Sequence, residues 1–281
     1  MQCAPTKASA VRIDSASQAV KRKGINPEGM MQIQGWGYET CFPYLLTLTM
    51  RFQGSAKSEL QNAIAERHAV RHYLSTPISD GTVSCINKAV RQINVKSGLN
   101  IQLVVDDPQA LSDLFVTYGR FSGARNYFAL VGPSGENLLE NIGYYGELIA
   151  LTCQSLGLNT CWVGGTYRKN PHRVVVNEGE EFVAIIAVGY GKNQGKQHTG
   201  KPIEELADGL ENAPRWYVEG VRSAMLGPSA HNKQNFRFNY QNGKVSVSGI
   251  AGKYSQIDVG IAKLHFEIGS GRSSEIWQET E

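Results

Sequence analysis

Two arginines four residues apart, Arg67 and Arg71, are the first residues whose type and spacing suggest chemistry. A planar guanidinium can meet two phosphate oxygens at once, whereas a lysine offers a single point charge. If the preceding helix continues, residues four apart lie on one helical face. The pair therefore indicates an anion site, and two solvated arginines on an exposed helix remain the alternative reading of the spacing.

A second polar segment, Pro228 to Gln234, offers hydrogen-bonding side chains from one short turn. Within it, Ser229, Asn232 and Gln234 supply both donors and acceptors. Pro228 restricts the backbone of that turn. The segment is suited to the polar edge of a planar ligand, although an ordinary Pro-Ser-Asn loop has a similar composition.

Glycines and basic residues mark two further positions. Gly164 and Gly165 follow the short apolar step Cys161-Trp162-Val163, where the absence of side chains would let a ligand approach the backbone. Cys161 itself reads as a packed thiol, since no nearby cysteine could resolve it. Lys201, in the segment from His198 to Lys201, adds positive charge.

Alternating helices and strands must position these residues. Helices are predicted from Ser58, with Ser58 as the cap and Gln61 three residues later, from Asp80 to Val95, and from Asn137, paired with Glu140 in a capping box, to a stop at Gly157. Strands are predicted at 101–105, 127–131 and 182–188, the last an apolar run typical of a sheet covered on both faces. The fold class is α+β, with a central mixed sheet flanked by helices.

Residues 1–57 differ from the rest in lacking a sustained periodicity, and we predict that they form a poorly ordered extension. A targeting peptide is the alternative, but acidic residues and the displaced apolar run count against it. Residues 58–281 are predicted to form the functional domain.

Composition excludes several classes of protein. The 281 residues are 41% hydrophobic and carry a net charge of +3 without a long basic run, so nucleic acid is not the expected partner. The five cysteines are scattered and contain no C-x-x-C pair, which favours a reducing cytoplasm and no metal site. No apolar stretch is long enough for a membrane span.

Taken together, these segments resemble the nitroreductase superfamily of FMN-dependent flavoproteins over residues 58 to about 271. The resemblance implies that Arg67, His68 and Arg71 hold the FMN phosphate, with Lys201 nearby. It implies that Gly164 and Gly165 present a backbone N–H to the flavin, and that the turn with Pro228, Ser229, Asn232 and Gln234 approaches the ring. In the family the motif usually reads Arg-x-Ser-x-Arg; here Ala69 replaces the serine, so one phosphate hydrogen bond is missing.

An internal repeat is suggested by two glycine-bounded helical segments of the same spacing, Gly146 to Gly157 and Gly260 to Gly271. The segments 86–105 and 221–240 also correspond. The arginine pair occurs only in the first half and the Pro-Ser turn only in the second. By resemblance to single-chain nitroreductases, we predict two related half-folds, about 58–195 and 196–281, that build one flavin site as a monomeric pseudo-dimer.

The activity implied by the resemblance is two-electron transfer from NADH or NADPH, a transient donor, to a small-molecule acceptor such as a nitroaromatic or quinone, by a ping-pong mechanism. The flavin supplies the reactive atom, and no catalytic side chain is assigned. The alternatives are flavin fragmentation or dehalogenation within the superfamily, a non-catalytic flavin-binding or sensory protein, and a structural protein without a ligand.

Overall fold

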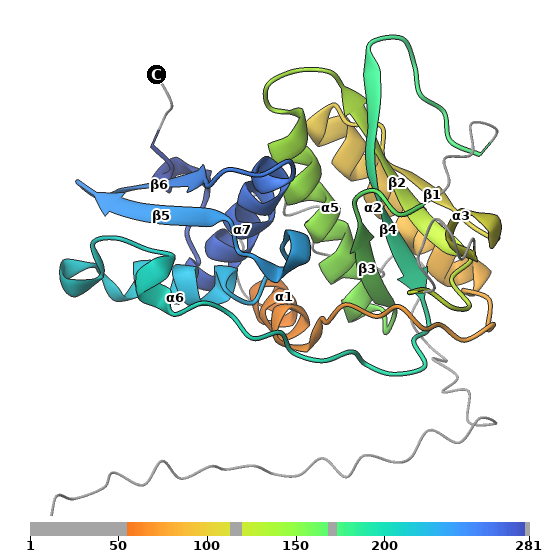
Figure 1. The fold of residues 1–281 in the computed structure, drawn as a ribbon, viewed down its shortest axis with the longest axis horizontal. Coiled ribbons are helices and arrows are strands. Elements are labelled where there is room, and N and C mark those ends of the chain that lie inside the picture. Colours follow the sequence, from red (N-terminus) through yellow and green to blue (C-terminus); the bar gives the residue numbers. More distant parts are fainter. Residues whose placement is uncertain (1–54, 113–119, 168–172, 279–281) are drawn as a thin grey trace, which may run out of the picture. The chain divides into compact units, whose positions relative to one another are not determined.

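Four strands form an antiparallel sheet in the order β1-β2-β4-β3 (Figure 1). The computed structural model describes residues 55–112, 120–167 and 173–278, all within one unit, Glu39–Glu281. The sheet consists of β1 (Gln102–Val104), β2 (Asn126–Pro133), β3 (Asn159–Val163) and β4 (Glu180–Gly189). A separate hairpin pairs β5 (Phe236–Gln241) with β6 (Lys244–Gly249).

Helices surround these strands. They are α1 (Ser55–Glu66), α2 (Asp80–Ser97), α3 (Gln109–Ser112), α5 (Leu138–Ser155), α6 (Arg215–Ala224) and α7 (Ser255–Ser270), with short 3-10 turns at Ile203–Glu205, Leu210–Asn212, Ala230–Asn232 and Ser274–Ile276. Within the described ranges, no helix combines the length and the apolar character that crossing a bilayer requires.

The apolar run in β4 lies at the centre of the sheet, as predicted. Alternate side chains of β4 enter two different cores, with Ile186 in the core on the α2 and α5 side and Ile185 in the other. Phe128 and Ala129 of β2 divide in the same way. Both faces of the sheet are therefore covered, which explains why polar residues do not alternate with apolar ones in these strands.

The α+β class is confirmed, but the prediction of a mixed sheet is wrong for the named strands, whose ladders are all antiparallel. Among the residues that the structure describes, parallel pairing is confined to isolated bridges, such as Ala69 with Thr160. Apolar runs report that a strand is buried, not in which direction its neighbour runs.

Helix ends agree with the sequence in part. The Oγ of Ser79 accepts the Thr82 N–H at 3.2 Å, and α2 ends at Gly98, whose φ is 71°. The predicted capping box of α5 does not form, because Asn137 is already helical in φ and ψ and its side chain makes no cap hydrogen bond. Gly157, with φ of 76°, still lies just beyond the end of α5.

Helix α1 begins at Ser55, so Ser58 lies inside the helix and is not its cap. The last three residues of the predicted extension therefore belong to α1, whose Leu60, Ala63 and Ile64 are buried. Lys57 lies against the end of α7, since a Cβ added to Gly271 would fall 2.3 Å from the Lys57 Nζ. Residues 1–54 lie outside the described residues.

A chain shortened to begin at Met50 is expected to keep the melting temperature of the full chain, because α1 stays intact. A chain that begins at Ser58 loses the first turn of α1 and the Lys57 contact, so it should melt at a lower temperature. Thermal unfolding followed by circular dichroism measures both. A Met50 chain that fails to fold would show that the earlier residues stabilise the domain.

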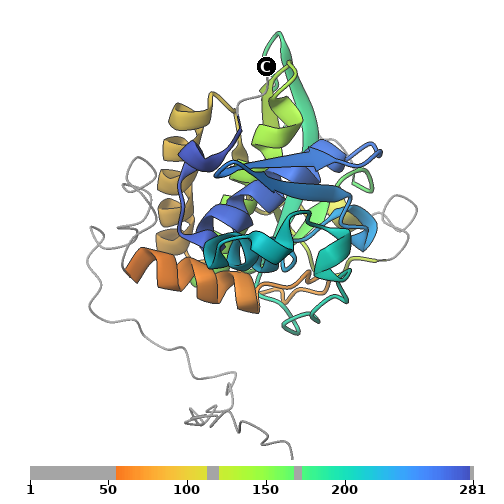
Figure 2. The same ribbon diagram turned by 90° about the vertical axis from the view of Figure 1, so that its left-hand side faces the viewer.

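The second half of the chain repeats the element order of the first. Helix, strand, strand and helix follow one another as α2–β1–β2–α5 and as α6–β5–β6–α7, with the short α3 between β1 and β2. Helices α5 and α7 lie side by side between the sheet and the hairpin (Figures 1 and 2). This order is compatible with two half-folds, which remain a prediction.

Candidate functional site

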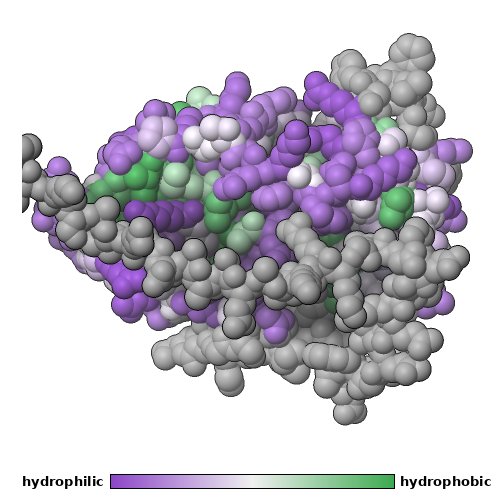
Figure 3. Space-filling model, turned by 90° about the horizontal axis from the view of Figure 1, so that it is seen from below, coloured by the Kyte–Doolittle hydropathy of each residue, from purple (hydrophilic) through white to green (hydrophobic). Residues whose placement is uncertain are grey.

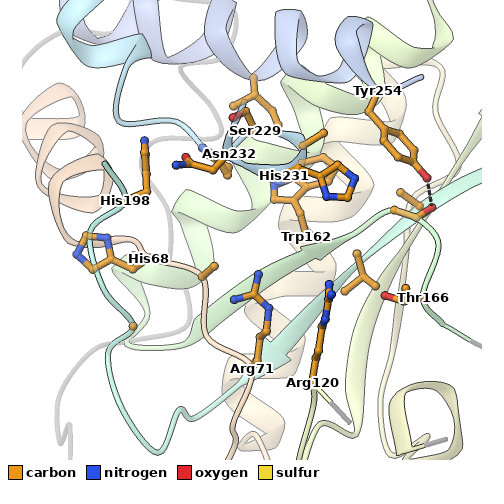
Figure 4. Close-up of a pocket in the computed structure, with 18 of the residues that line it drawn as sticks. His68, Arg71, Arg120, Trp162, Thr166, His198, Ser229, His231, Asn232 and Tyr254 are labelled. Carbon is orange, nitrogen blue, oxygen red and sulfur yellow. Dashed lines mark hydrogen bonds between the residues drawn. The ribbon is translucent and has the colours of Figure 1, made fainter. Parts of the chain in front are cut away.

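A cavity of about 1040 Å³ is lined by segments that are far apart in the sequence (Figure 4). Eight of the ten predicted site residues line it: Arg67, His68, Arg71, Gly164, Gly165, Pro228, Ser229 and Asn232. Arg71 reaches into it from the side opposite Ser229 and Asn232 (Figure 4). The arginine segment and the Pro-Ser turn therefore converge on one place, and their roles toward a ligand stay a prediction.

The arginine segment is extended, not helical. Helix α1 ends at Glu66, and Val70 donates its backbone N–H to Thr160 O of β3 at 3.0 Å. Arg67 stands at the end of α1, where its N–H donates to Ala63 O at 2.8 Å, and Arg71 follows in the extended part, so no single helical or strand repeat relates the two arginines. The expectation of one helical face is wrong in conformation, although both arginines line the cavity.

Arg67 is 3% exposed, and its Nε lies 3.1 Å from Oε1 of Glu147 in α5. That N–H is not directed at the carboxylate and has no hydrogen-bond partner. Arg71, by contrast, is exposed to the cavity. The two arginines thus differ, since one is a buried member of an ion pair and the other is a solvated cation.

The Pro228 turn carries backbone strain. His231 and Asn232 have φ of 54° and 56°, values that non-glycine residues adopt only when their surroundings impose them. Asn232 donates its side-chain N–H to Thr199 O at 3.0 Å, and the Ser229 Oγ accepts the Gln234 N–H at 3.0 Å. Strain of this kind concentrates at ligand sites.

Gly164 and Gly165 follow β3 directly and lie beside Tyr254, whose hydroxyl donates to Gly164 O at 3.1 Å. A Cβ on Gly164 would fall 2.9 Å from the Tyr254 ring, so a side chain there would displace the tyrosine. Burial raises the pKa of the nearby Cys161 thiol despite the positive charges of Arg71 and Arg67. Cys161 is therefore a protonated, packed thiol, as predicted.

Gln234 and Lys201 are the two predicted site residues that do not line the cavity, and a contact of either with a ligand stays a prediction. Gln234 is 1% exposed, and its side chain accepts the Lys201 N–H at 2.6 Å and donates to Met225 O at 3.0 Å. The Lys201 Nζ lies 3.5 Å from Gln234 O. These two residues fix the loop that carries the Pro228 turn.

Several lining residues were not singled out from the sequence: Arg120, Trp162, Thr166, Lys196, His231, Tyr254 and Asp258. Of the predicted segment from His198 to Lys201, His198 lines the cavity, and Lys196 lies two residues before it. Arg120 runs beside Arg71 into the cavity (Figure 4), and no spacing in the sequence relates the two. Among the charged lining residues, the cations Arg67, Arg71, Arg120 and Lys196 outnumber the one acid, Asp258, which suits an anionic ligand.

The charge state of two lining residues is shifted. Burial, followed by the charge of Arg67, lowers the pKa of His68, so its imidazole is neutral at pH 7 until an anion binds. Burial also raises the pKa of Asp258 to about 6. The Asp258 Oδ1 accepts the Ala230 N–H at 2.9 Å, and its Oδ2 has no partner.

The Asp258→Asn variant is expected to be more stable than the parent at pH 7 and equally stable near pH 4. Because the folded-state pKa is raised, ionisation of Asp258 costs stability as pH rises from about 4 to 6. The amide keeps an acceptor for Ala230, and the gain at pH 7 is about 1 to 3 kcal/mol. Urea unfolding at both pH values measures it, and a difference independent of pH would contradict the assignment.

The face seen in Figure 3 is mainly hydrophilic where it is not covered by grey atoms, and hydrophobic residues gather toward the end that carries α6 and the β5–β6 hairpin.

Within residues 55–112, 120–167 and 173–278, no three histidine, cysteine or acidic side chains are grouped closely enough to hold a metal ion.

A family model and several solved structures match this chain. A family model described as "Putative TM nitroreductase" matches residues 59–270. A putative nitroreductase from Thermotoga maritima is 23% identical, with a TM-score of 0.54 over 75% of this chain and 82% of that one. That likeness supports the fold.

Two further solved structures match with lower TM-scores. An FMN-dependent nitroreductase from Clostridium difficile is 17% identical over 54% of this chain and 96% of its own, with a TM-score of 0.39. A putative nitroreductase from Desulfovibrio desulfuricans, solved with FMN, is 20% identical over 52% and 93%, with a TM-score of 0.40. No curated protein matches the chain. Because the family model spans most of the chain, this protein belongs to the nitroreductase family of oxidoreductases.

Proposed function

We propose that this chain is an FMN-dependent NAD(P)H oxidoreductase that passes two electrons to a nitroaromatic, quinone or similar acceptor by a ping-pong mechanism. One observation carries the proposal: the arginine segment, the glycine pair and the Pro228 turn, more than 150 residues apart at their extremes, line a single cation-rich cavity. A single chain supplies every part of this cavity, so we also propose that a monomer acts as a pseudo-dimer.

The residues present fit FMN by their chemistry. A phosphate of nearly two negative charges matches the cations Arg67 and Lys196 in the lining, and His198 adds a ring nitrogen there. His68 is neutral without a ligand, because burial lowers its pKa, and an anion bound beside it would raise that pKa and favour the imidazolium. Gly195 permits the close approach of these segments, because a Cβ there would fall 2.7 Å from the His68 Cβ.

The ring system of a flavin requires a flat apolar wall and a few polar groups. Trp162, Ile257 and Ile261 supply apolar surface in the same cavity. Ser229 and Asn232 lie across from Arg71 and can meet hydroxyl and carbonyl groups (Figure 4). A bound FMN would supply the two-electron chemistry, and Arg71 would provide positive charge that stabilises a negative, reduced ligand in the cavity.

The test is an absorption spectrum of the purified protein followed by steady-state oxidation of NADH and NADPH with menadione or nitrofurazone as acceptor. A flavin spectrum with turnover that depends on the acceptor supports the proposal. A yellow protein without turnover would identify a flavin-binding protein that is not an enzyme. A colourless protein that does not take up added FMN would refute the proposal.

The Ala69→Ser variant is expected to bind FMN at least as tightly as the parent. Ala69 lines the cavity between the two arginines, so a hydroxyl there restores the hydrogen bond that the family motif supplies. A hydrogen bond to a charged group contributes about 1.5 to 3 kcal/mol, an upper limit of roughly tenfold to a hundredfold in Kd. Weaker binding by a variant with an unchanged melting temperature would contradict the assignment.

A further inference from the structure

Glu147, in the middle of α5, is wholly buried and contacts three side chains from different parts of the fold. Its Oε2 accepts the Trp162 Nε1–H at 2.7 Å. Its Oε1 lies 3.1 Å from the Arg67 Nε and 3.1 Å from the His265 Nε2. Arg67 and Trp162 line the cavity, whereas Glu147 and His265 lie behind its wall.

The surroundings of His265 define its protonation. The ring is 0% exposed, with Nε2 at 3.1 Å from the Glu147 carboxylate and Nδ1 at 3.2 Å from the Ser223 carbonyl oxygen. Both neighbours are acceptors, and a neutral imidazole has only one N–H to donate. Either neutral tautomer would leave a ring lone pair facing an oxygen, so only the imidazolium satisfies both contacts.

The charges of this cluster do not cancel. Burial alone would raise the pKa of Glu147, but Arg67 and the donors His265 and Trp162 outweigh it and lower the pKa, so the carboxylate is ionised. In the described part of the chain, the ion pairs of Arg67 and His265 are both made with Glu147. With His265 as the imidazolium that its two acceptors require, one carboxylate faces two positive charges, which leaves a net charge of +1 on the cluster.

We propose that Glu147 is the positioning residue of the cavity: it holds Arg67 and Trp162 in the wall and keeps His265 as a buried imidazolium, so that a net positive charge faces an anionic ligand. The role toward a ligand rests on the proposed function. The protonation of His265 does not, and the two parts are tested separately.

The first experiment measures the protonation of His265 in the full chain without flavin. Ring 15N signals of histidine-labelled protein are recorded from pH 6 to 8, and His265→Gln identifies the signal. The expected result is an imidazolium at pH 7 in the parent and a neutral ring at the same pH in Glu147→Gln. A neutral His265 in the parent at pH 7 would overturn the proposal, whether or not the protein binds FMN.

The second experiment compares two buried carboxylates. Glu267 is 4% exposed and accepts hydrogen bonds from Tyr144 and Trp277, both at 2.6 Å, but it does not line the cavity. Glu267→Gln is therefore a matched control for the loss of a buried negative charge. Both variants should melt earlier, but only Glu147→Gln should raise the Kd for FMN, by about tenfold.

Riboflavin, which lacks the phosphate, separates charge from shape in the same titration. Glu147→Gln should weaken riboflavin binding less than FMN binding, because Arg67 is the charged group that Glu147 orients. Equal losses of FMN affinity in Glu147→Gln and Glu267→Gln would overturn the positioning role. If Glu147→Gln does not fold, Glu147→Asp replaces it: the charge is kept and His265 should stay protonated, while the shorter side chain should raise the FMN Kd.

Discussion

Replacing Arg67 with alanine is expected to weaken FMN binding by roughly one to two decades, the equivalent of about 1.5 to 3 kcal/mol for a charge-assisted hydrogen bond. Asn232→Ala should weaken the same flavin, because both residues line one cavity although they belong to opposite halves of the chain. Titration of protein fluorescence with FMN measures both affinities.

The control for charge is Lys88→Ala, which removes an exposed cation of α2 from outside the cavity lining and should leave the FMN Kd unchanged. Flavin released by denaturation, measured against protein concentration, gives the number of sites. A ratio near one that falls in both the Arg67 and Asn232 variants supports a single shared site. A ratio near two, or an Arg67 variant that retains FMN as tightly as the parent, would rule out the fused pseudo-dimer.

The largest loss of stability is expected from Gly260→Ala. A Cβ on Gly260 of α7 would fall 2.0 Å from Glu140 O and 2.7 Å from Tyr144 N, both backbone atoms of α5. Backbone cannot rotate away as a side chain can, so α5 and α7 would have to separate. We expect the free energy of unfolding to fall by about 3 kcal/mol, with a weakened flavin site, because α5 and α7 pack directly against each other.

Gly81→Ala is the matched control, since Gly81 also lies in a helix but has no atom closer than 4.0 Å to an added Cβ. At that exposed position alanine should be neutral or stabilise the chain by up to about 1 kcal/mol. Guanidinium unfolding measures both variants. A Gly260→Ala protein as stable as the parent would mean that α5 and α7 can move apart without cost.

Much of the local structure followed from the sequence. The apolar runs of β2 and β4 and the start of α2 depend on neighbouring residues, and all of these were predicted close to their observed bounds. The arginine pair was predicted to share one helical face, but α1 ends at Glu66, before both residues. A spacing of four residues fits about one helical turn and also two repeats of an extended strand, so the spacing alone could not distinguish a helix from an extended segment.

Residue types likewise indicated which segments meet, but they did not indicate which hydrogen-bond donors and acceptors stay free to bind a ligand. Gln234 has the donors and acceptors that a ligand needs, yet Lys201 and Met225 occupy them, so the side chain holds a loop in place. Arg120 enters the cavity without any signal in the sequence, because its neighbour Arg71 is nearly fifty residues away in the chain.

The sequence by itself determined the α+β class, the order of the main helices and strands from α1 to β4, and the residue types that suit an anionic, planar ligand, because these depend on local periodicity and side-chain chemistry. Only the tertiary structure decided that the sheet is antiparallel, that Arg67 is buried against Glu147, and that one carboxylate serves both Arg67 and His265. Burial and long-range pairing set the charge of such groups, and both arise only when distant segments pack together.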